Sequence, residues 1–199
     1  MIALKAADIA ILHDRCLATP GWANSGTVAH ATGPWQAIED NHRCTCLLWD
    51  EEDLARRRNV ADAEIAKNKR AIDGHNQKRN DAIERMDGLL LASFEKIKIK
   101  PGAKLNSETA GAMIDRLSIL SLKVHHMRLQ TERKDVDSAH IESCRLKLAR
   151  LIEQRTDLAS CLERLLAECA RGEAYFKIYR QFKMYNDPAL NPAIYGEKS

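Results

Sequence analysis

The sequence predicts an all-α protein, an antiparallel bundle of four long helices with short helices at its N- and C-terminal ends. Only 5% of the residues are aromatic, and the 199 residues include 9 glycines and 5 prolines. Alanine, leucine, lysine, arginine and glutamate dominate instead, which is the composition of long helices rather than of a sandwich or barrel. Four long helices with short connections pack most simply as an antiparallel bundle.

Each element is expected between breaker residues. A short helix over about residues 3–17 precedes a loop that contains Pro20 and Gly21. Pro34 suits the start of the first long helix, and Asn106 or Ser107 suits the N-cap of the third. The expected ranges are 34–58, 61–94, 107–133 and 136–171 for the long helices, about 171–185 for a short C-terminal helix and 186–199 for an irregular tail, all in a single domain of residues 1–199.

The distribution of charge disfavours two classes of partner. The net charge of +3 comes from 31 basic and 28 acidic residues spread through the chain, so no polybasic tail offers nucleic acid a counterion-releasing surface. No basic leader precedes an apolar run at the start, and no segment reaches the roughly 18 apolar residues of a membrane span. We therefore expect a cytoplasmic protein that binds no nucleic acid and does not insert into a membrane.

The cysteines are expected to be free thiols that pack as small hydrophobic groups, because they fall mostly in helical periodicity. Cys44 and Cys46 are two residues apart, which points their side chains about 200° away from each other on a helix. That geometry suits joint metal ligation badly, so no metal site is predicted at these two cysteines, and the sequence identifies no cofactor. The six cysteines are Cys16, Cys44, Cys46, Cys144, Cys161 and Cys169.

Polar side chains recur on the helix faces that hydropathy predicts to be buried. In the helix over 107–133, Arg116 and Lys123 lie one heptad apart between two arcs of apolar residues. A buried charge without a partner costs several kcal/mol, so such groups form either a structural network or a ligand site. The candidates on these faces are His42, Glu52, Asp53, Arg56, Asn76, Arg79, Asn80, Arg116 and Lys123.

Several long stretches resemble one known family. They include MIDRLSIL at 113–120, NHRCTCLLWDEEDLARR at 41–57, AIDGHNQKRNDAIERMD at 71–87 and QFKMYNDPALNP at 181–192. The first looks like the DRLSIL signature of the bacterial family called domain of unknown function 4254, and the likeness covers most of the chain. The resemblance implies a single-domain bacterial protein, of a kind sometimes encoded near glycosyltransferase genes of surface-polysaccharide assembly. It assigns no activity.

The first hypothesis is that a polar, cation-lined core binds an anionic small molecule, such as a sugar phosphate or a nucleotide sugar. Guanidinium groups take carboxylate and phosphate in bidentate fashion, and amides add neutral hydrogen bonds. Whether the protein is an enzyme is left open. The ligand-binding candidates are Arg56, Asn76, Arg79, Asn80, Asp115, Arg116, Lys123 and Lys183, and the candidate acids and bases are His42, Glu52 and Asp53.

Two further hypotheses stay open. Glu52 and Asp53, together with Glu84 and Asp87, are similar to the magnesium-binding carboxylates of all-α nucleotide pyrophosphohydrolases, although half of that motif is missing. Alternatively, the polar core is structural and the protein is a non-enzymatic assembly partner in a glycosyltransferase system, or a homodimer. Aromatic residues near the chain ends would suit such an interface.

Overall fold

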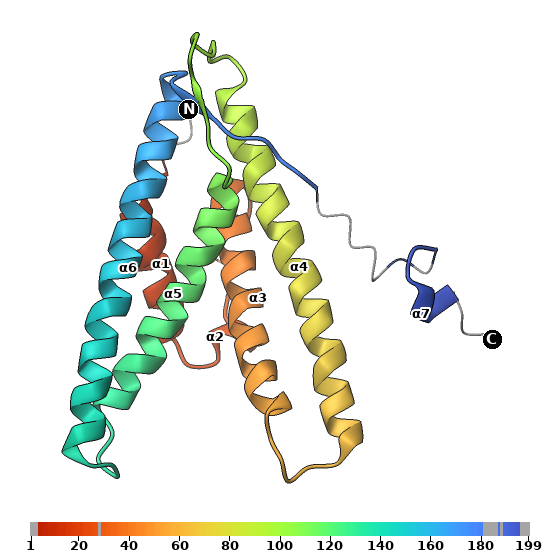
Figure 1. Cartoon of the computed structure of the whole chain (residues 1–199), viewed down its shortest axis with the longest axis vertical. Helices are drawn as coiled ribbons and strands as arrows, with labels where there is room; N and C mark the ends of the chain where they lie inside the picture. Colours follow the sequence, from red (N-terminus) through yellow and green to blue (C-terminus); the bar gives the residue numbers. More distant parts are fainter. Residues whose placement is uncertain (1–3, 28, 181–186, 188, 196–199) are drawn as a thin grey trace.

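The computed structural model describes residues 4–27, 29–180, 187 and 189–195 and confirms the all-α class (Figure 1). The four expected long helices are present, each within three residues of its expected bounds. The helices are α1 (Ala6–Ala18), α2 (Trp22–Ser25), α3 (Gly33–Ala55), α4 (Asp62–Phe94), α5 (Ala110–Thr131), α6 (Ser138–Ala170) and α7 (Pro192–Tyr195). Two short strands, β1 (Lys104–Leu105) and β2 (Ala174–Tyr175), pair in parallel.

The long helices form two antiparallel hairpins, α3 with α4 and α5 with α6 (Figure 1). The hairpins meet along α5, which packs on both α3 and α4, and they spread apart towards the α3–α4 and α5–α6 loops. Helix α1 packs on α3, α5 and α6 and completes the core beside α5. The arrangement is therefore more open than a closed bundle of four helices.

Several local boundaries differ from the expected ones for identifiable reasons. Helix α5 begins after Thr109, whose Oγ1 accepts a hydrogen bond of 3.1 Å from the Ala112 N–H. Asn106 does not cap this helix, because its N–H donates to the Tyr175 carbonyl and extends the β1–β2 pairing. The prediction of a short C-terminal helix is wrong over 172–180, since Gly172 takes a positive φ of 70° and β2 follows. Residues 181–185 lie outside the described part of the chain.

Two short helices fall in segments that were expected to be irregular. Helix α2 lies in the loop before α3, where Arg43 donates to the carbonyls of Trp22, Ala23 and Gly26 and stacks over the Trp22 ring at 4.4 Å. Helix α7 lies in the predicted irregular tail. In the first case a guanidinium on α3 satisfies the Ala23 and Gly26 carbonyls at the end of the short helix, while the Trp22 carbonyl also accepts the Gly26 N–H at 2.9 Å.

The hydrophobic core lies where α1, α3, α4, α5 and α6 come together. Its largest fully buried apolar side chains come from all five helices, so α1 is an integral part of the core. They are Ile9, Ile38, Met86, Leu90, Ile114, Leu117, Val124 and Leu162.

Helices α4 and α5 approach each other closely at Gly111. A Cβ atom there would lie 2.7 Å from the Ile83 carbonyl oxygen and 2.8 Å from Asp87 Oδ1. The same Asp87 oxygen accepts a hydrogen bond of 2.6 Å from the Gly111 N–H. Glycine at this position therefore allows the backbone of α5 to lie against α4.

Gly111→Ala should destabilise the protein by about 1–3 kcal/mol, the usual cost of forcing an atom into a packed contact. Gly88→Ala is the matched control, because nothing lies within 4 Å of its added Cβ and alanine stabilises a helix by up to about 1 kcal/mol. Urea unfolding measures both free energies. Equal stability of the two variants would contradict the assigned close contact.

Candidate functional site

The centre of the face that helix α5 buries differs from the one that hydropathy predicts. Arg116 and Lys123 were expected on its buried arc, and both are exposed. Asp115, Ser118 and Ser121 are buried instead. Short polar side chains can be buried when they find hydrogen-bond partners, whereas long cationic side chains can reach water.

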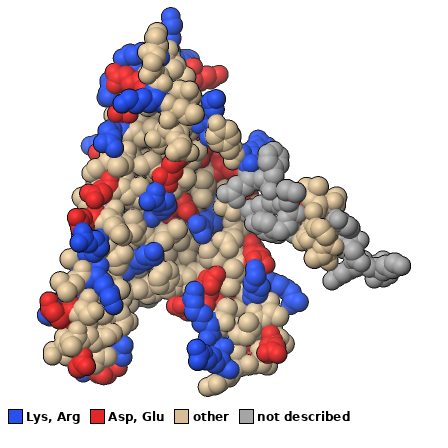
Figure 2. Space-filling model, in the orientation of Figure 1, with Lys and Arg blue, Asp and Glu red and all other residues tan. Residues whose placement is uncertain are grey.

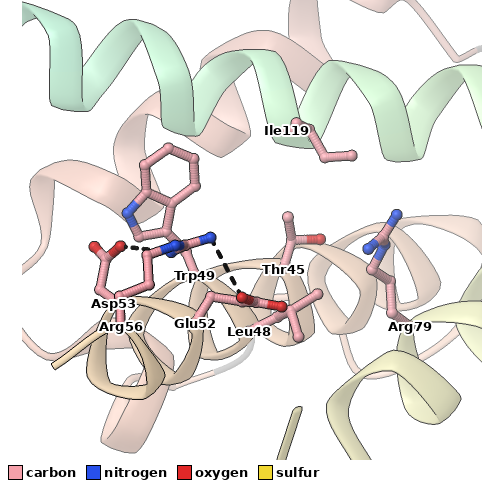
Figure 3. Close-up of a pocket in the computed structure, with 8 residues that line it drawn as sticks. All are labelled: Thr45, Leu48, Trp49, Glu52, Asp53, Arg56, Arg79 and Ile119. Carbon is pink, nitrogen blue, oxygen red and sulfur yellow. Dashed lines mark hydrogen bonds and ion pairs between the residues drawn. The ribbon is translucent and has the colours of Figure 1, made fainter. Parts of the chain in front are cut away.

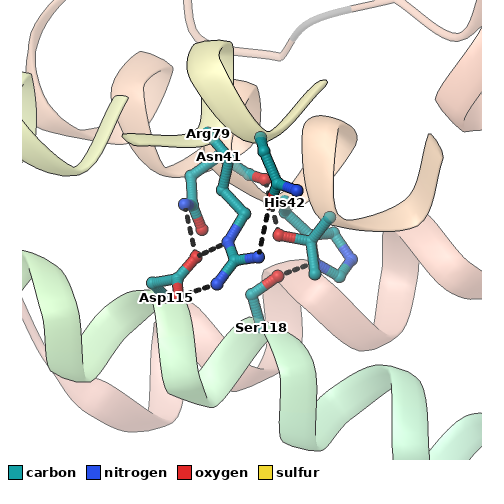
Figure 4. A network of polar contacts seen from close by, with 7 residues as sticks. Asn41, His42, Arg79, Asp115 and Ser118 are labelled. Atoms are coloured by element: carbon teal, nitrogen blue, oxygen red, sulfur yellow. Dashed lines mark hydrogen bonds and ion pairs between the residues drawn. The ribbon is translucent and has the colours of Figure 1, made fainter. Parts of the chain in front are cut away.

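Asp115 holds three helices together (Figure 4). Arg79 of α4 donates through Nε to Asp115 Oδ1 at 2.7 Å and through Nη2 to Oδ2 at 3.0 Å. Asn41 of α3 donates to Asp115 Oδ1 at 2.9 Å. Asn76 lies beside this pair, with its Oδ1 atom 3.4 Å from Arg79 Nη1. The Asp115 side chain is 7% exposed and that of Arg79 is 22% exposed, so the pair is largely removed from water.

His42 belongs to a second buried group (Figure 4). A hydrogen bond of 2.7 Å joins His42 Nδ1 to Ser118 Oγ, and the His13 ring stacks on the His42 ring at 4.2 Å. Burial lowers the pKa of His42 to about 3. Burial, with His42 and Arg155 nearby, also lowers the pKa of His13 well below its ordinary value. Both rings are fully buried and line none of the cavities described below, so His42 is not placed to act as an acid or base on a bound ligand.

A first cavity, the α3–α5 cavity, lies between α3 and α5 and is also lined by Arg79 of α4 (Figure 3). Its volume is about 230 Å³. Arg56 lies at this cavity with Nη2 3.3 Å from Glu52 Oε2 and Nη1 3.0 Å from Asp53 Oδ1. Trp49 stacks on His126 of α5 with ring centroids 4.6 Å apart. The lining residues are Thr45, Leu48, Trp49, Glu52, Asp53, Arg56, Arg79 and Ile119.

A second cavity, the α5–α6 cavity, adjoins the first and has a volume of about 560 Å³. Ile119 lines both cavities. Arg116 donates to both carboxylate oxygens of Glu108 at 2.8 and 2.9 Å. Lys123 makes no ion pair with any described residue. The lining residues are Glu108, Met113, Arg116, Ile119, Leu120, Lys123, Gln154, Asp157, Leu158 and Cys161.

The carboxylates that a pyrophosphohydrolase would need are not brought together. Glu52 and Asp53 line the α3–α5 cavity, whereas Glu84 and Asp87 line a third cavity of about 340 Å³ at the start of α5. Asp87 is also occupied by the Gly111 N–H, and burial raises the pKa of its carboxyl. Among the described residues no group of three or more potential ligands could hold a metal ion.

The structure thus divides the predicted site. The cations that were expected in a polar core border two adjoining cavities instead. These cavities hold as many carboxylates as cations. The cations are Arg56, Arg79, Arg116 and Lys123. The predicted residues at these two cavities are Glu52, Asp53, Arg56, Arg79, Arg116 and Lys123. Asn76 and Asp115 lie behind Arg79, in contact with its guanidinium group. Asn80 lines the third cavity, and Lys183 lies outside the described residues.

Sequence reasoning missed several residues that shape these cavities. Thr45 and Ile119 line the α3–α5 cavity, while Gln154 and Asp157 of α6 line the α5–α6 cavity. Hydropathy placed Ile119 in a buried apolar arc, and nothing in the pattern of α6 separates Gln154 and Asp157 from a solvated face. His13 carried no motif, and its stacking on His42 depends on the docking of α1.

These features place the protein in the class of all-α proteins. Its two helical hairpins are splayed, and cavities lie between its helices. The chain matches the family model described as "Protein of unknown function (DUF4254)" over residues 35–178. The chain belongs to this family. No curated protein and no solved structure matches it in the comparisons made. No helix within the described residues is long and apolar enough to cross a membrane.

Asp115→Asn should destabilise the protein by about 3 kcal/mol, because it leaves the largely buried Arg79 guanidinium without a counter-charge. The double variant Arg79→Met/Asp115→Leu should lose less stability than Asp115→Asn, since it removes both charges. Glu142→Gln is the control, because it removes an exposed ion pair with Arg145 and should change stability by under about 0.5 kcal/mol. An Asp115→Asn loss no larger than this control, measured by urea unfolding, would refute the role of the pair.

Acid should destabilise the protein through the two buried histidines. Their pKa values are lowered in the folded state, so stability is retained above the ordinary pKa of 6.5 and falls as the unfolded chain takes up protons below it. Each histidine contributes a slope of about 1.4 kcal/mol per pH unit.

Comparing the pH dependence of unfolding between variants separates the contribution of the buried histidines from that of other titratable groups. Asp50 and Asp87 have raised pKa values and act in the opposite sense, because the folded protein binds their protons more readily. Urea unfolding between pH 7 and 5 should therefore show a shallower slope for His13→Leu than for the wild type, while the Ile11→Leu control, at an exposed position on the same helix that carries no titratable group, keeps the wild-type slope. Parallel slopes for all three would contradict the assignment.

Proposed function

We propose that this protein binds an anionic small molecule, a sugar phosphate or a nucleotide sugar, in the α3–α5 and α5–α6 cavities across Ile119. The observation that carries the proposal is that Ile119 lines both cavities while each is lined by two of the candidate cations. The α5–α6 cavity of about 560 Å³ is within the range of small-ligand sites, roughly 300–1,000 Å³, and the α3–α5 cavity of about 230 Å³ lies just below that range. A ligand with two parts could occupy both cavities at once.

The α3–α5 cavity is suited to the uncharged part of such a ligand. Leu48, Trp49 and Ile119 give it an apolar wall, and such walls with a few placed polar groups are typical of ligand pockets. Glu52 and Asp53 can accept hydrogen bonds from sugar hydroxyls. Their proposed role as acid or base in a reaction stays a prediction.

The α5–α6 cavity is suited to the anionic part. Lys123 is exposed there and is not committed to a carboxylate of the described residues. Arg116 is paired with Glu108, but the Arg116 side chain is 56% exposed, so exchanging Glu108 for a ligand phosphate costs little. Both cations can therefore turn to an incoming anion.

Arg79 is suited to positioning rather than to charge attraction. Asp115 neutralises it and fixes its plane through two hydrogen bonds. A guanidinium carries five N–H groups, so donors remain for the cavity that Arg79 lines. A donor held in place in this way adds specificity for the orientation of a bound ligand.

The proposal includes a cytoplasmic site of action in a bacterium, in surface-polysaccharide metabolism. The thiols support the compartment, because all six cysteines are free, as is usual in reducing surroundings. The pathway rests on the family resemblance alone.

Isothermal titration calorimetry with UDP-glucose and with pyrophosphate tests the proposal. The wild type should bind UDP-glucose more tightly than pyrophosphate, because only the former reaches both cavities. Lys123→Met and Arg56→Met should each weaken UDP-glucose binding by about tenfold, the loss of one charged hydrogen bond. Lys147→Met, which removes an exposed lysine that lines neither cavity, should bind like the wild type.

Two outcomes would overturn the proposal. One is a wild-type protein that binds neither probe. The other is Lys123→Met and Arg56→Met variants that fold, as circular dichroism would show, and bind as tightly as Lys147→Met.

A further inference from the structure

The end of the molecule that carries the α4–α5 loop has an uninterrupted basic edge. Lys96, Lys98, Lys100 and Lys104 occur in this loop and in β1 without an acidic residue between them. All four are exposed. The loop lies at the end of the molecule opposite the α3–α4 and α5–α6 loops, where basic side chains are visible together with some acidic ones (Figures 1 and 2). We call these four lysines the basic edge.

Most of the charge on the basic edge is not neutralised. Glu173 pairs with Lys100 at 3.0 Å and with Arg171 at 2.7 Å, so it is shared by two cations. Lys96, Lys98 and Lys104 form no ion pair with any described residue. The segment therefore carries a local positive charge, although the whole chain is nearly balanced.

The backbone holds the basic edge in a fixed shape. The Lys100 N–H donates to the Gly172 carbonyl at 2.9 Å, and the Lys104 N–H donates to the Glu173 carbonyl at 2.9 Å. Gly172 lies so close to the Lys98 carbonyl that a Cβ atom would collide with it. Little ordering entropy would be lost when such a segment meets a partner.

Aliphatic side chains lie among the lysines. Ile99 is 54% exposed and Leu105 is 48% exposed, both unusually open for their type. Ile99 also borders an apolar cavity of about 240 Å³, whose lining residues include Leu91, Phe94, Ile97, Tyr175 and Phe176. A basic edge is thus combined with an accessible apolar surface.

We propose that this end of the protein docks on the surface of a lipid bilayer that contains anionic lipids. Lysines near such a surface are attracted by its negative potential, and exposed aliphatic groups can enter the region between headgroups and acyl chains. Nucleic acid is a poorer fit, because no aromatic residue stands between Lys96 and Lys104 to stack on bases. The inference is independent of the proposed ligand site, whose two cavities contain none of these residues.

Co-sedimentation of the full-length chain with vesicles tests the inference. The protein should sediment with vesicles of phosphatidylcholine and phosphatidylglycerol, less with phosphatidylcholine alone, and less at high salt. Each lysine near an anionic surface contributes about fivefold to partitioning, so Lys96→Glu/Lys98→Glu should bind at least about 25-fold more weakly. Ile99→Ser should weaken binding to the anionic vesicles severalfold at unchanged net charge.

Lys134→Glu/Lys147→Glu is the matched control, because it reverses two exposed lysines at the opposite end of the molecule, neither in an ion pair with a described residue. It should keep most of the wild-type vesicle binding. Equal loss in both double variants would show a dependence on net charge only and would overturn the inference. Absence of vesicle binding, together with tight binding to a DNA duplex in fluorescence anisotropy, would overturn it in favour of a nucleic-acid surface.

Discussion

The pairing of Arg79 with Asp115 is the interaction on which the arrangement of the two hairpins depends. It joins α4 to α5 and therefore links one hairpin to the other, and Asn41 adds α3 to the same carboxylate. One turn earlier on α5, Gly111 donates to Asp87 of α4. Each helix thus offers a carboxylate to the other, and the two contacts together fix the register of α5 on α4. Removing such charges from water is costly and offsets much of the attraction between them, so the net contribution of the pair to stability is smaller than the cost of breaking it.

This register also determines where the cavity forms. The helices are joined firmly at Asp87 and Asp115, and the hairpins diverge beyond these contacts. The stack of Trp49 on His126 is a further contact between α3 and α5, and both Trp49 and Arg79 line the α3–α5 cavity. The cavity is therefore a consequence of the splay, and its wall includes a side chain from the interaction that holds the hairpins together.

The sequence predicts the helices far better than the faces that they bury. Composition and breakers place the four long helices to within three residues, because these signals are local. The helical periodicity placed Arg116 and Lys123 on the buried arc of α5, whereas the structure exposes both and buries Ser118 and Ser121. The reason is tertiary: His42 and Arg155 provide hydrogen-bond partners for the serines, and small side chains let helices pack closely. The β1–β2 pair and the docking of α1 depend on contacts between distant segments, which no periodicity reveals.

The balance of charge at the two cavities limits how a ligand could be recognised. The two cavities are lined by equal numbers of cations and carboxylates, so no strong field attracts an anion from a distance. The cations are Arg56, Arg79, Arg116 and Lys123, and the carboxylates are Glu52, Asp53, Glu108 and Asp157. Binding must then depend on local exchange of partners at Lys123 and Arg116, on donors that Arg79 holds in place, and on contact with the apolar wall. Such a site discriminates by shape and hydrogen bonding rather than by charge alone. The uncompensated positive charge lies elsewhere, on the basic edge, and this separation allows one end of the protein to engage a charged surface while the cavities remain selective for a small molecule.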